Sequence, residues 1–207
     1  MITMAAPDLR IGLTGRMASG KGEAVRILKN YGLRYISLSD IVRREAAKIH
    51  PTLDRGQMQD LGNRLRAQGG AGVLGRMVRE LIEAAEPGPW VIDGIRNPAE
   101  VMELRKMAGF FLLGIESHID AILARLKKRG RPTDVVNEAE LRAVLEREWG
   151  RSEPEDGQQV GPTMDMADFL IDNNGSLPQL EASLEALLKQ IGVQHDKKKH
   201  GGLSGIV

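Results

Sequence analysis

The sequence predicts an α/β protein with three layers, in which helices cover both faces of a central parallel sheet. Short, nearly continuous apolar runs alternate along the chain with segments whose apolar residues recur at helical spacing. Strands buried on both faces of a parallel sheet have such continuous apolar runs, and the alternation is typical of strand–helix–strand units. The chain has 207 residues, enough for one domain with a sizeable core.

The expected elements follow in order along the chain. Strands are expected in 9–15, 34–40, 90–92 and 110–117, and a last strand and turn in 167–177, after a polar segment. Helices are expected in 23–32, 41–49, 53–85, 97–109, from Ile119 onward and in 178–192. The stretch "QGGAGVLG" within 53–85 predicts a turn between two helices. Proline near the start and glycine at the end support the helix in 97–109.

Composition excludes several classes of function. The formal net charge of +1 argues against nucleic acid as a partner, and no apolar run approaches the roughly 18 residues of a membrane span. The chain contains no cysteine, which excludes thiolate chemistry. The first residues, "MITMAAPDLR", lack the pattern of a secretory signal, so we expect a cytoplasmic protein. Residues 193–207 contain three consecutive lysines and are expected to form a flexible basic tail after a domain spanning 1–192.

The stretch "GRMASGKG" (15–22) follows the first strand and precedes a helix. Its spacing matches the phosphate-binding loop G-x-x-x-x-G-K through Lys21. Backbone N–H groups in such a loop point into one concavity, and the start of the helix adds partial positive charge. Gly15 and Gly20 permit the tight turn and close approach of phosphate, and Lys21 reaches the β- and γ-phosphates. The alternative is a glycine-rich turn with an incidental lysine.

The last position of the motif differs from the usual Ser or Thr, because Gly22 stands there, followed by Glu23. Mg²⁺ keeps several waters and is held partly by substrate phosphates, so a loop ending in Gly-Lys-Gly works if the metal is held through water. The loop resembles that of adenylate kinase and other nucleoside monophosphate kinases, which continue with Thr where this chain has Glu23. This resemblance implies ATP and Mg²⁺ as ligands. The ATP-binding residues implied in the loop are Gly15, Ala18, Ser19, Gly20, Lys21, Gly22 and Glu23.

The segment "SLSDIVRREA" (37–46) resembles the acceptor-binding segment of adenylate kinase. Asp40 is expected to cap a helix. The resemblance implies that Asp40 and Arg43, one turn later, belong to the acceptor site, where Arg43 binds the acceptor's phosphate, with Arg44 as a substitute. An ordinary helix cap with two solvated arginines is the alternative. Helices in about 41–86 are expected to cover the acceptor, where the polar residues available for contacts are Gln57, Gln59, Asn63, Arg64 and Gln68.

The segment "WVIDGIRNPAEV" (90–101) places Asp93 at the end of a strand. Its turn is similar to the Asp-Gly-x-x-Arg turn of monophosphate kinases, one residue shorter. By this resemblance Asp93 organises Mg²⁺ through water and Arg96 binds the acceptor phosphate, which suits the guanidinium fork. Beside Asp93 stands Gly94, where ATPases that use water as the nucleophile usually carry a base, so transfer to a second substrate is favoured.

The segment "ARLKKRGRPTD" (124–134) is strongly basic, and a solvated basic face is the common interpretation of such a run. In chain order it is similar to the lid of the same kinases, expected here as a short lid over about 125–151. The resemblance implies that Arg125 binds ATP and that Arg129 and Arg131 close over the transferring phosphoryl group. Arg147 and Arg151, on the helix after the lid, are further candidates for the same phosphates.

The segment "ADFLIDNNGSLPQL" (167–180) is similar to the C-terminal strand and turn of dephospho-CoA kinases. The resemblance implies that Asn174 and Gly175 lie near the adenine of ATP, although a strand ending in an Asn-Gly turn explains them equally well. From 11 to 190 the chain also resembles uncharacterised nucleotide kinase-like proteins that share "SDIVR", "LGNRLR", "DGIRNPAEV", "RLKKRGR" and "GQQV". This resemblance implies the P-loop kinase fold.

Together these features predict an ATP-dependent phosphotransferase whose acceptor is a nucleoside monophosphate or a similar small phosphorylated molecule. Dephospho-CoA kinase is the alternative within enzymes. The alternative of another class is a nucleotide-binding regulatory module, in which Gly22 and Glu23 mark lost turnover. We expect a monomer or homodimer with no nucleic-acid or membrane partner.

Overall fold

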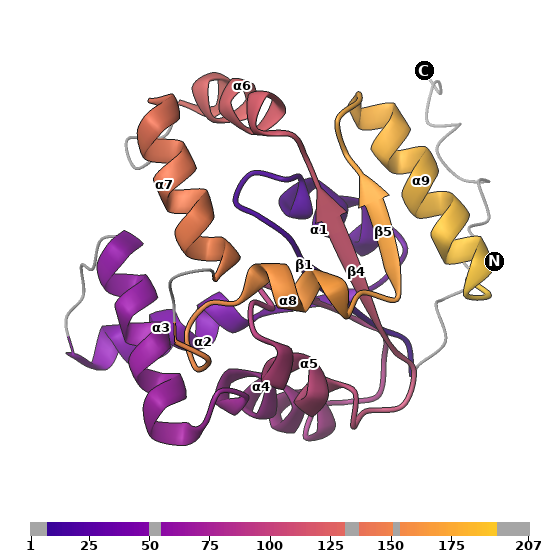
Figure 1. Ribbon diagram of the computed structural model, residues 1–207. Coiled ribbons are helices and arrows are strands. Elements are labelled where there is room, and N and C mark those ends of the chain that lie inside the picture. Colours follow the sequence, from indigo (N-terminus) through magenta and orange to yellow (C-terminus); the bar gives the residue numbers. More distant parts are fainter. Residues whose placement is uncertain (1–7, 50–54, 131–136, 151–153, 194–207) are drawn as a thin grey trace, which may run out of the picture.

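The computed structural model describes residues 8–49, 55–130, 137–150 and 154–193 and confirms the three-layer α/β fold. Five parallel strands lie in the order β2-β3-β1-β4-β5, between helices on both faces (Figure 1). The strands are β1 Arg10–Thr14, β2 Arg34–Ser37, β3 Trp90–Asp93, β4 Phe110–Glu116 and β5 Phe169–Asp172. The helices are α1 Lys21–Asn30, α2 Leu38–Ile49, α3 Arg55–Gly69, α4 Val73–Glu83, α5 Pro98–Leu104, α6 Ile119–Arg129, α7 Glu138–Trp149, α8 Val160–Asp165 and α9 Leu177–Gln190.

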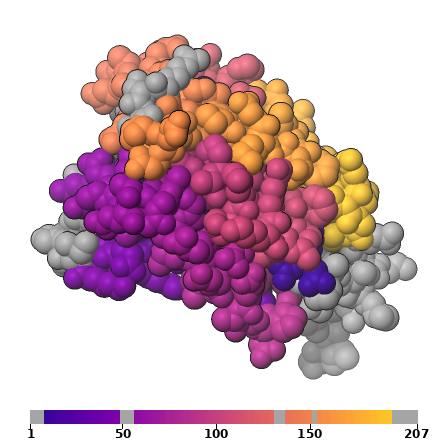
Figure 2. Space-filling view, turned by 60° about the horizontal axis from the view of Figure 1, so that its bottom comes forward, coloured from indigo at the N-terminus to yellow at the C-terminus, as the bar shows by residue number. Residues whose placement is uncertain are grey.

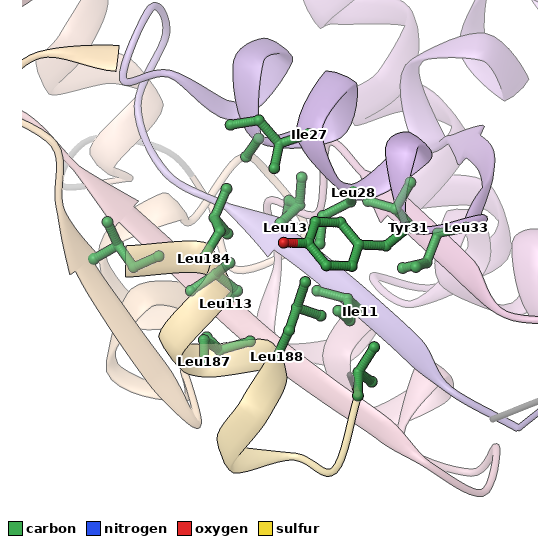
Figure 3. Packing of buried hydrophobic residues seen from close by; sticks show 14 of the residues in the cluster. Ile11, Leu13, Ile27, Leu28, Tyr31, Leu33, Leu113, Leu184, Leu187 and Leu188 are labelled. Carbon is green, nitrogen blue, oxygen red and sulfur yellow. The ribbon is translucent and has the colours of Figure 1, made fainter. Parts of the chain in front are cut away.

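One face of the sheet packs against α1 and α9. Ile11 and Leu13 alternate along β1 and are fully buried on this face, because successive side chains of a strand point to opposite sides. Figure 3 shows Leu184 and Leu188 of α9 turned toward the side chains of β1 and α1. This layer holds the start of α1 against the end of β1, where the phosphate loop lies.

The opposite face packs against α2, α4 and α5. Gly12 faces this side, and a Cβ atom there would lie 2.6 Å from Ile95 Cδ1 and 2.7 Å from Phe110 Cζ. The glycine therefore lets the turn after β3 approach the central strand. Figure 2 shows the outside of this half of the molecule, where α3, α4, α5 and α8 form one continuous surface.

A third, smaller apolar cluster lies between α6 and α7. It contains Ile122, Leu126, Leu141 and Leu145, all buried, and it also contains the buried side chain of Met17 from the phosphate loop. The segment expected to form a lid thus shares a core with the loop itself.

Three boundaries differ from the sequence expectation. The second strand ends at Ser37 instead of running to Asp40, because α2 begins at Leu38. The polar segment before β5 contains α8, which buries Val160 and Met164. Val193, placed in the tail by the sequence, is buried, and its N–H donates to Leu188 O; the rest of the expected tail lies outside the described residues.

Within the described ranges, no helix combines the length and apolar character that crossing a membrane requires.

Because α4 packs closely on α5, we expect alanine substitutions at two helical glycines to have different effects on stability. A Cβ atom at Gly75 would lie 2.7 Å from Glu100 O, whereas one at Gly62 has its nearest neighbour at 3.6 Å. Gly75→Ala should therefore lower the free energy of unfolding by about 1–3 kcal/mol through overpacking. Gly62→Ala should raise it by up to about 1 kcal/mol through helix propensity. Urea unfolding of both variants measures the difference, and equal effects would contradict the described packing.

Candidate functional site

A cavity of about 690 Å³ lies beside the phosphate loop and the turn after β3. Parallel strands of an open sheet bind ligands outside their carboxyl ends, and β1 and β3 are hydrogen-bonded neighbours, so their two following loops meet there. The lining residues come from both loops, from the end of β3, from α1, α2, α3, α4 and α6, and from Gln158. They are Met17, Ala18, Gly20, Lys21, Gly22, Glu23, Leu38, Ser39, Val42, Arg43, Met58, Gln59, Gly62, Arg66, Leu74, Asp93, Gly94, Arg96, Arg125, Arg129 and Gln158.

The two loop glycines are required by the backbone. Gly15 has a φ of +136° and Gly20 a φ of +112°, conformations that side chains disfavour. A Cβ atom would also lie 2.2 Å from Ile115 O at Gly15 and 2.0 Å from Asn173 Nδ2 at Gly20. The loop therefore closes tightly onto the ends of β4 and β5.

Lys21 opens helix α1, whose start has no side-chain cap. Its ammonium group donates to Gly15 O at 2.6 Å and to Arg16 O at 2.7 Å, and so lies across its own loop. Ser19, predicted with the loop, is fully buried, whereas Ala18 lines the cavity in a left-handed conformation with a φ of +56°.

Gly22 and Glu23 both line the cavity. Nothing lies within 4 Å of a Cβ atom placed at Gly22, so the site has room for a side chain that the sequence does not supply. The exposed Glu23 carboxylate accepts from Arg26 Nε at 2.9 Å. Its charge is therefore paired on the outer side of α1.

Asp93 ends β3 and lines the cavity, and its Oδ1 accepts from the N–H of Gly94 at 2.7 Å. Gly94 has a φ of +82°, which permits this sharp turn. In the part of the chain that the structure describes, no three acidic or histidine side chains gather as a metal-binding group.

Arg96 lines the cavity with its guanidinium group held by two side chains that the sequence did not single out. Its Nη1 donates to Gln158 Oε1 at 3.0 Å and lies 3.6 Å from Glu148 Oε1. Glu148 also accepts from the N–H of Met17 at 2.9 Å. Both partners come from segments distant in sequence; the shared segment "GQQV" contained Gln158, but no local pattern indicated that either residue contacts Arg96.

A buried ion pair supports the same turn from the other side. Glu100 is fully buried, and its Oε1 accepts from Arg66 Nε at 2.9 Å, while its Oε2 accepts from the N–H groups of Arg96 and Asn97 at 2.8 and 3.1 Å. The "NPAE" pattern could have indicated Glu100 as part of a capping box. Arg66 is the last residue of the shared segment "LGNRLR", but nothing in that segment indicated Glu100 as its partner.

The acceptor segment differs in part from its prediction. Arg43 lines the cavity and is exposed, but Asp40 does not line it and forms an ion pair with Arg43. Asp40 is also not the helix cap: α2 begins two residues earlier, and Ser37 Oγ accepts from the N–H of Ser39 at 3.1 Å. Of the polar residues expected on the helices in 41–86, only Gln59 lines the cavity.

The basic segment contributes Arg125 and Arg129 to the cavity. Arg125 Nη1 donates to Ser117 Oγ at 2.8 Å and to Ser19 O at 3.3 Å, so it braces the phosphate loop. Partial burial lowers the pKa of the Arg125 guanidinium from its ordinary value.

Of the remaining predicted arginines, the structure describes Arg147. Arg147 does not line the cavity and pairs with Asp60 at 2.8 Å, which joins α7 to α3. Arg131 and Arg151 lie outside the described residues.

The turn after β5 contacts the phosphate loop through a residue that the sequence did not single out. Asn174 and Gly175 do not line the cavity, and Asn174 Oδ1 accepts from the N–H of His118 at 2.7 Å. Asn173 instead reaches the phosphate loop, where its Nδ2 donates to Ser19 O at 2.7 Å. Successive side chains of an extended backbone point to opposite sides, so the neighbouring asparagine and not Asn174 contacts the loop.

Comparisons with known proteins agree with this geometry. A family model described as an AAA domain matches residues 14–142, more than half of the chain. The UPF0200 protein of Methanoculleus marisnigri is 34% identical over 185 residues, covering 88% of this chain and 96% of the relative. The UPF0200 protein of Methanothermobacter thermautotrophicus is 31% identical over 194 residues, covering 93% and 95%.

Solved structures share the fold. TT1252 from Thermus thermophilus aligns with a TM-score of 0.58 at 20% identity, covering 88% of this chain and 97% of that one. Shikimate kinase from Bacteroides thetaiotaomicron aligns with a TM-score of 0.52 at 17% identity, covering 88% and 98%. The sheet and the loop thus define a P-loop protein with the kinase type of α/β fold. Within that class, the chain belongs to the UPF0200 family, and residues 14–142 match the AAA domain.

Because Arg66 pairs with the buried Glu100, we expect substitutions of two arginines of α3 to differ markedly in their effect on the free energy of unfolding. Arg66→Met leaves the Glu100 carboxylate buried without its charge partner, which should lower the free energy of unfolding by about 3–5 kcal/mol. Arg64 is exposed on the same helix, so Arg64→Met should change it by less than about 0.5 kcal/mol. Chemical denaturation of both variants gives the comparison; similar small effects would show that the pair does not support the turn.

Proposed function

We propose that the protein is an ATP-dependent phosphotransferase that acts on a nucleoside monophosphate or a similar small phosphorylated acceptor. One observation carries this proposal: a single cavity contains the phosphate loop together with Arg43, Arg66 and Arg96 from three other segments. Its volume of about 690 Å³ lies within the range of small-molecule sites. A donor and an anionic acceptor would therefore meet in one enclosure.

The phosphate loop supports the donor side of the proposal. Its glycines bring the backbone close, and the uncapped start of α1 favours negative charge. Lys21 holds two loop carbonyls at hydrogen-bond distance, and phosphate oxygens would take over these bonds. Arg125 and Asn173 hold Ser19 O from outside, so the loop is preorganised for this exchange.

The residues present fit magnesium held largely by water and phosphate. Asp93 offers a carboxylate to the cavity, and Gly22 offers no hydroxyl. Mg²⁺ is commonly bound through one or two carboxylates plus substrate phosphates and waters. When bound, the ion would neutralise charge on the phosphates.

The acceptor side combines cations with apolar surface. Arg96 is held at a fixed orientation by Gln158 and Glu148, and its fork suits phosphate oxygens. Leu38, Val42, Met58 and Leu74 line the cavity together with Gln59. Apolar walls with a polar amide suit a nucleobase, whose faces are apolar and whose edges form hydrogen bonds. Arg129, at the end of α6, supports closure over the transferring group.

A nucleotide-binding regulatory module is the competing proposal of another class. Gly22 favours it, because the usual hydroxyl for the metal is missing. Glu23 does not favour it, since its carboxylate pairs with Arg26 rather than with Lys21. Mg-ATP binding without transfer to any acceptor would select this alternative.

The phosphate loop predicts the effect of removing its lysine. Lys21→Ala should lower the rate of phosphoryl transfer by at least about 100-fold, because the cation that stabilises the transferring charge is lost. The fold should persist, since the two described hydrogen bonds of the Lys21 ammonium group are made to carbonyls of its own loop. Lys29→Ala, at the exposed end of the same helix, is the matched control. Near-normal turnover of Lys21→Ala would remove the loop from the mechanism.

If Arg96 binds the acceptor, the rate of ATP use should depend on the presence of a second substrate. Without an acceptor, ATP hydrolysis should run at about one hundredth or less of the transfer rate, because placing the nucleophile supplies at least that factor. Arg96→Ala should weaken acceptor binding by about 1.5–3 kcal/mol, the range for hydrogen bonds to charged groups. ADP release with each nucleoside monophosphate and with dephospho-CoA measures both effects.

Arg142→Ala serves as the control, because Arg142 is exposed on α7 and pairs with Glu138. Fast ADP release that needs no acceptor and ignores Arg96→Ala would identify an NTPase instead.

A further inference from the structure

The carboxylate of Glu148 joins two parts of the site that are far apart in sequence. It lies on the last turn of α7 and is 2% exposed. One oxygen accepts from the N–H of Met17 in the phosphate loop, at 2.9 Å, and the other lies 3.6 Å from Arg96 Nη1. A buried carboxylate requires compensation of this kind, because desolvation of an unpaired charge is costly.

Helices α6 and α7 hold the loop by two further contacts. The Met17 side chain is buried among Ile122, Leu126, Leu141 and Leu145, which belong to α6 and α7. The next residue of α7, Trp149, lies under the guanidinium of Arg16, 4.3 Å from the ring centroid. Two consecutive loop residues, 16 and 17, are therefore seated on one helix end.

Arg96 depends on Glu148 for more than charge balance. Its Nη1 donates to Gln158 Oε1 at 3.0 Å and forms an ion pair with Glu148 Oε1 at 3.6 Å, and its backbone N–H donates to Glu100. Removing the Glu148 charge would leave Gln158 as the one described side-chain acceptor for this group. The guanidinium would then be less well oriented toward the cavity.

We propose that Glu148 is a positioning residue of phosphoryl transfer, which couples the donor loop to the acceptor arginine through α7. The inference rests on the proposed function and adds a residue to it. The hydrogen bond to Met17 fixes the donor loop, and the charge fixes Arg96. Two substitutions separate these contributions.

Glu148→Gln keeps an oxygen for the N–H of Met17 and removes the charge from Arg96. We expect the Kd for Mg-ATP to stay within about twofold of wild type, while kcat/KM for the acceptor falls by about tenfold or more. Glu148→Met keeps the volume and removes the contacts to the Met17 N–H and to Arg96, so the Kd for Mg-ATP should also rise by about fivefold or more. Glu140→Gln, exposed on the same helix, should change neither quantity by more than about twofold.

The double variant Arg96→Ala/Glu148→Gln separates positioning from a general structural effect. If Glu148 acts through Arg96, Glu148→Gln should add less than about twofold to the loss in kcat/KM already caused by Arg96→Ala. A purely structural role would lower kcat/KM by the same factor in both backgrounds. Titration calorimetry with Mg-ATP, steady-state transfer to the best acceptor and thermal melts supply the measurements.

Three results would overturn the proposal: wild-type kinetics in Glu148→Gln, equal losses with and without Arg96, or an unchanged Mg-ATP Kd in a folded Glu148→Met. If Glu148→Met does not melt cooperatively, the nearly isosteric Glu148→Gln and the double variant decide the outcome. Absence of transfer by the wild type to every acceptor would instead overturn the proposed function.

Discussion

The fully buried carboxylate of Glu100 is the interaction on which the rest of the site depends. It receives the backbone N–H groups of Arg96 and Asn97 and the guanidinium of Arg66, so it fixes the turn after β3 to α3. Asn97 then carries the constraint onward, because its Nδ2 donates to Glu155 O and Gly157 O, both at 2.9 Å. A satisfied buried network of this kind specifies one arrangement of its members. This network therefore fixes α3 and the segment before α8 relative to the turn that follows Asp93.

The phosphate loop is held in a similar way by groups outside its own motif. Asn173 and Arg125 bond to Ser19 O, Ser117 Oγ donates to the same carbonyl at 3.0 Å, and Glu148 accepts from Met17. These contacts come from the ends of β4 and β5 and from α6 and α7. A loop with several positive-φ residues is costly to order, and the surrounding contacts compensate for that cost. The loop is consequently preorganised, which is the requirement for electrostatic stabilisation of a transferring phosphoryl group.

The arginines of the cavity form ion pairs within the protein, and these pairs determine how readily each arginine could bind an anion. Arg66 faces Glu100, Arg96 faces Glu148, and Arg43 faces Asp40. Only the Arg43 pair is substantially exposed, so solvent screens it and Arg43 is the easiest to redirect toward an anion. Arg66 and Arg96 are oriented by buried carboxylates instead. The fold alone does not determine which acceptor binds, because one fold supports many activities. The acceptor is determined by the side chains that line this cavity.

Local sequence determined the parts of the protein whose physics is local. Continuous apolar runs predicted the five strands. The spacing of the loop motif located Lys21, because neighbouring residues determine a turn and the start of a helix. Asp93, Arg96, Arg43 and Arg125 also lie at the cavity, since the carboxyl ends of parallel strands meet at one edge. Tertiary structure alone decided that Asn173 rather than Asn174 reaches the loop and that Glu148 contacts Met17 across 131 residues. Such contacts depend on how helices dock on the sheet, and that is set by summed packing over both faces and not by any short pattern.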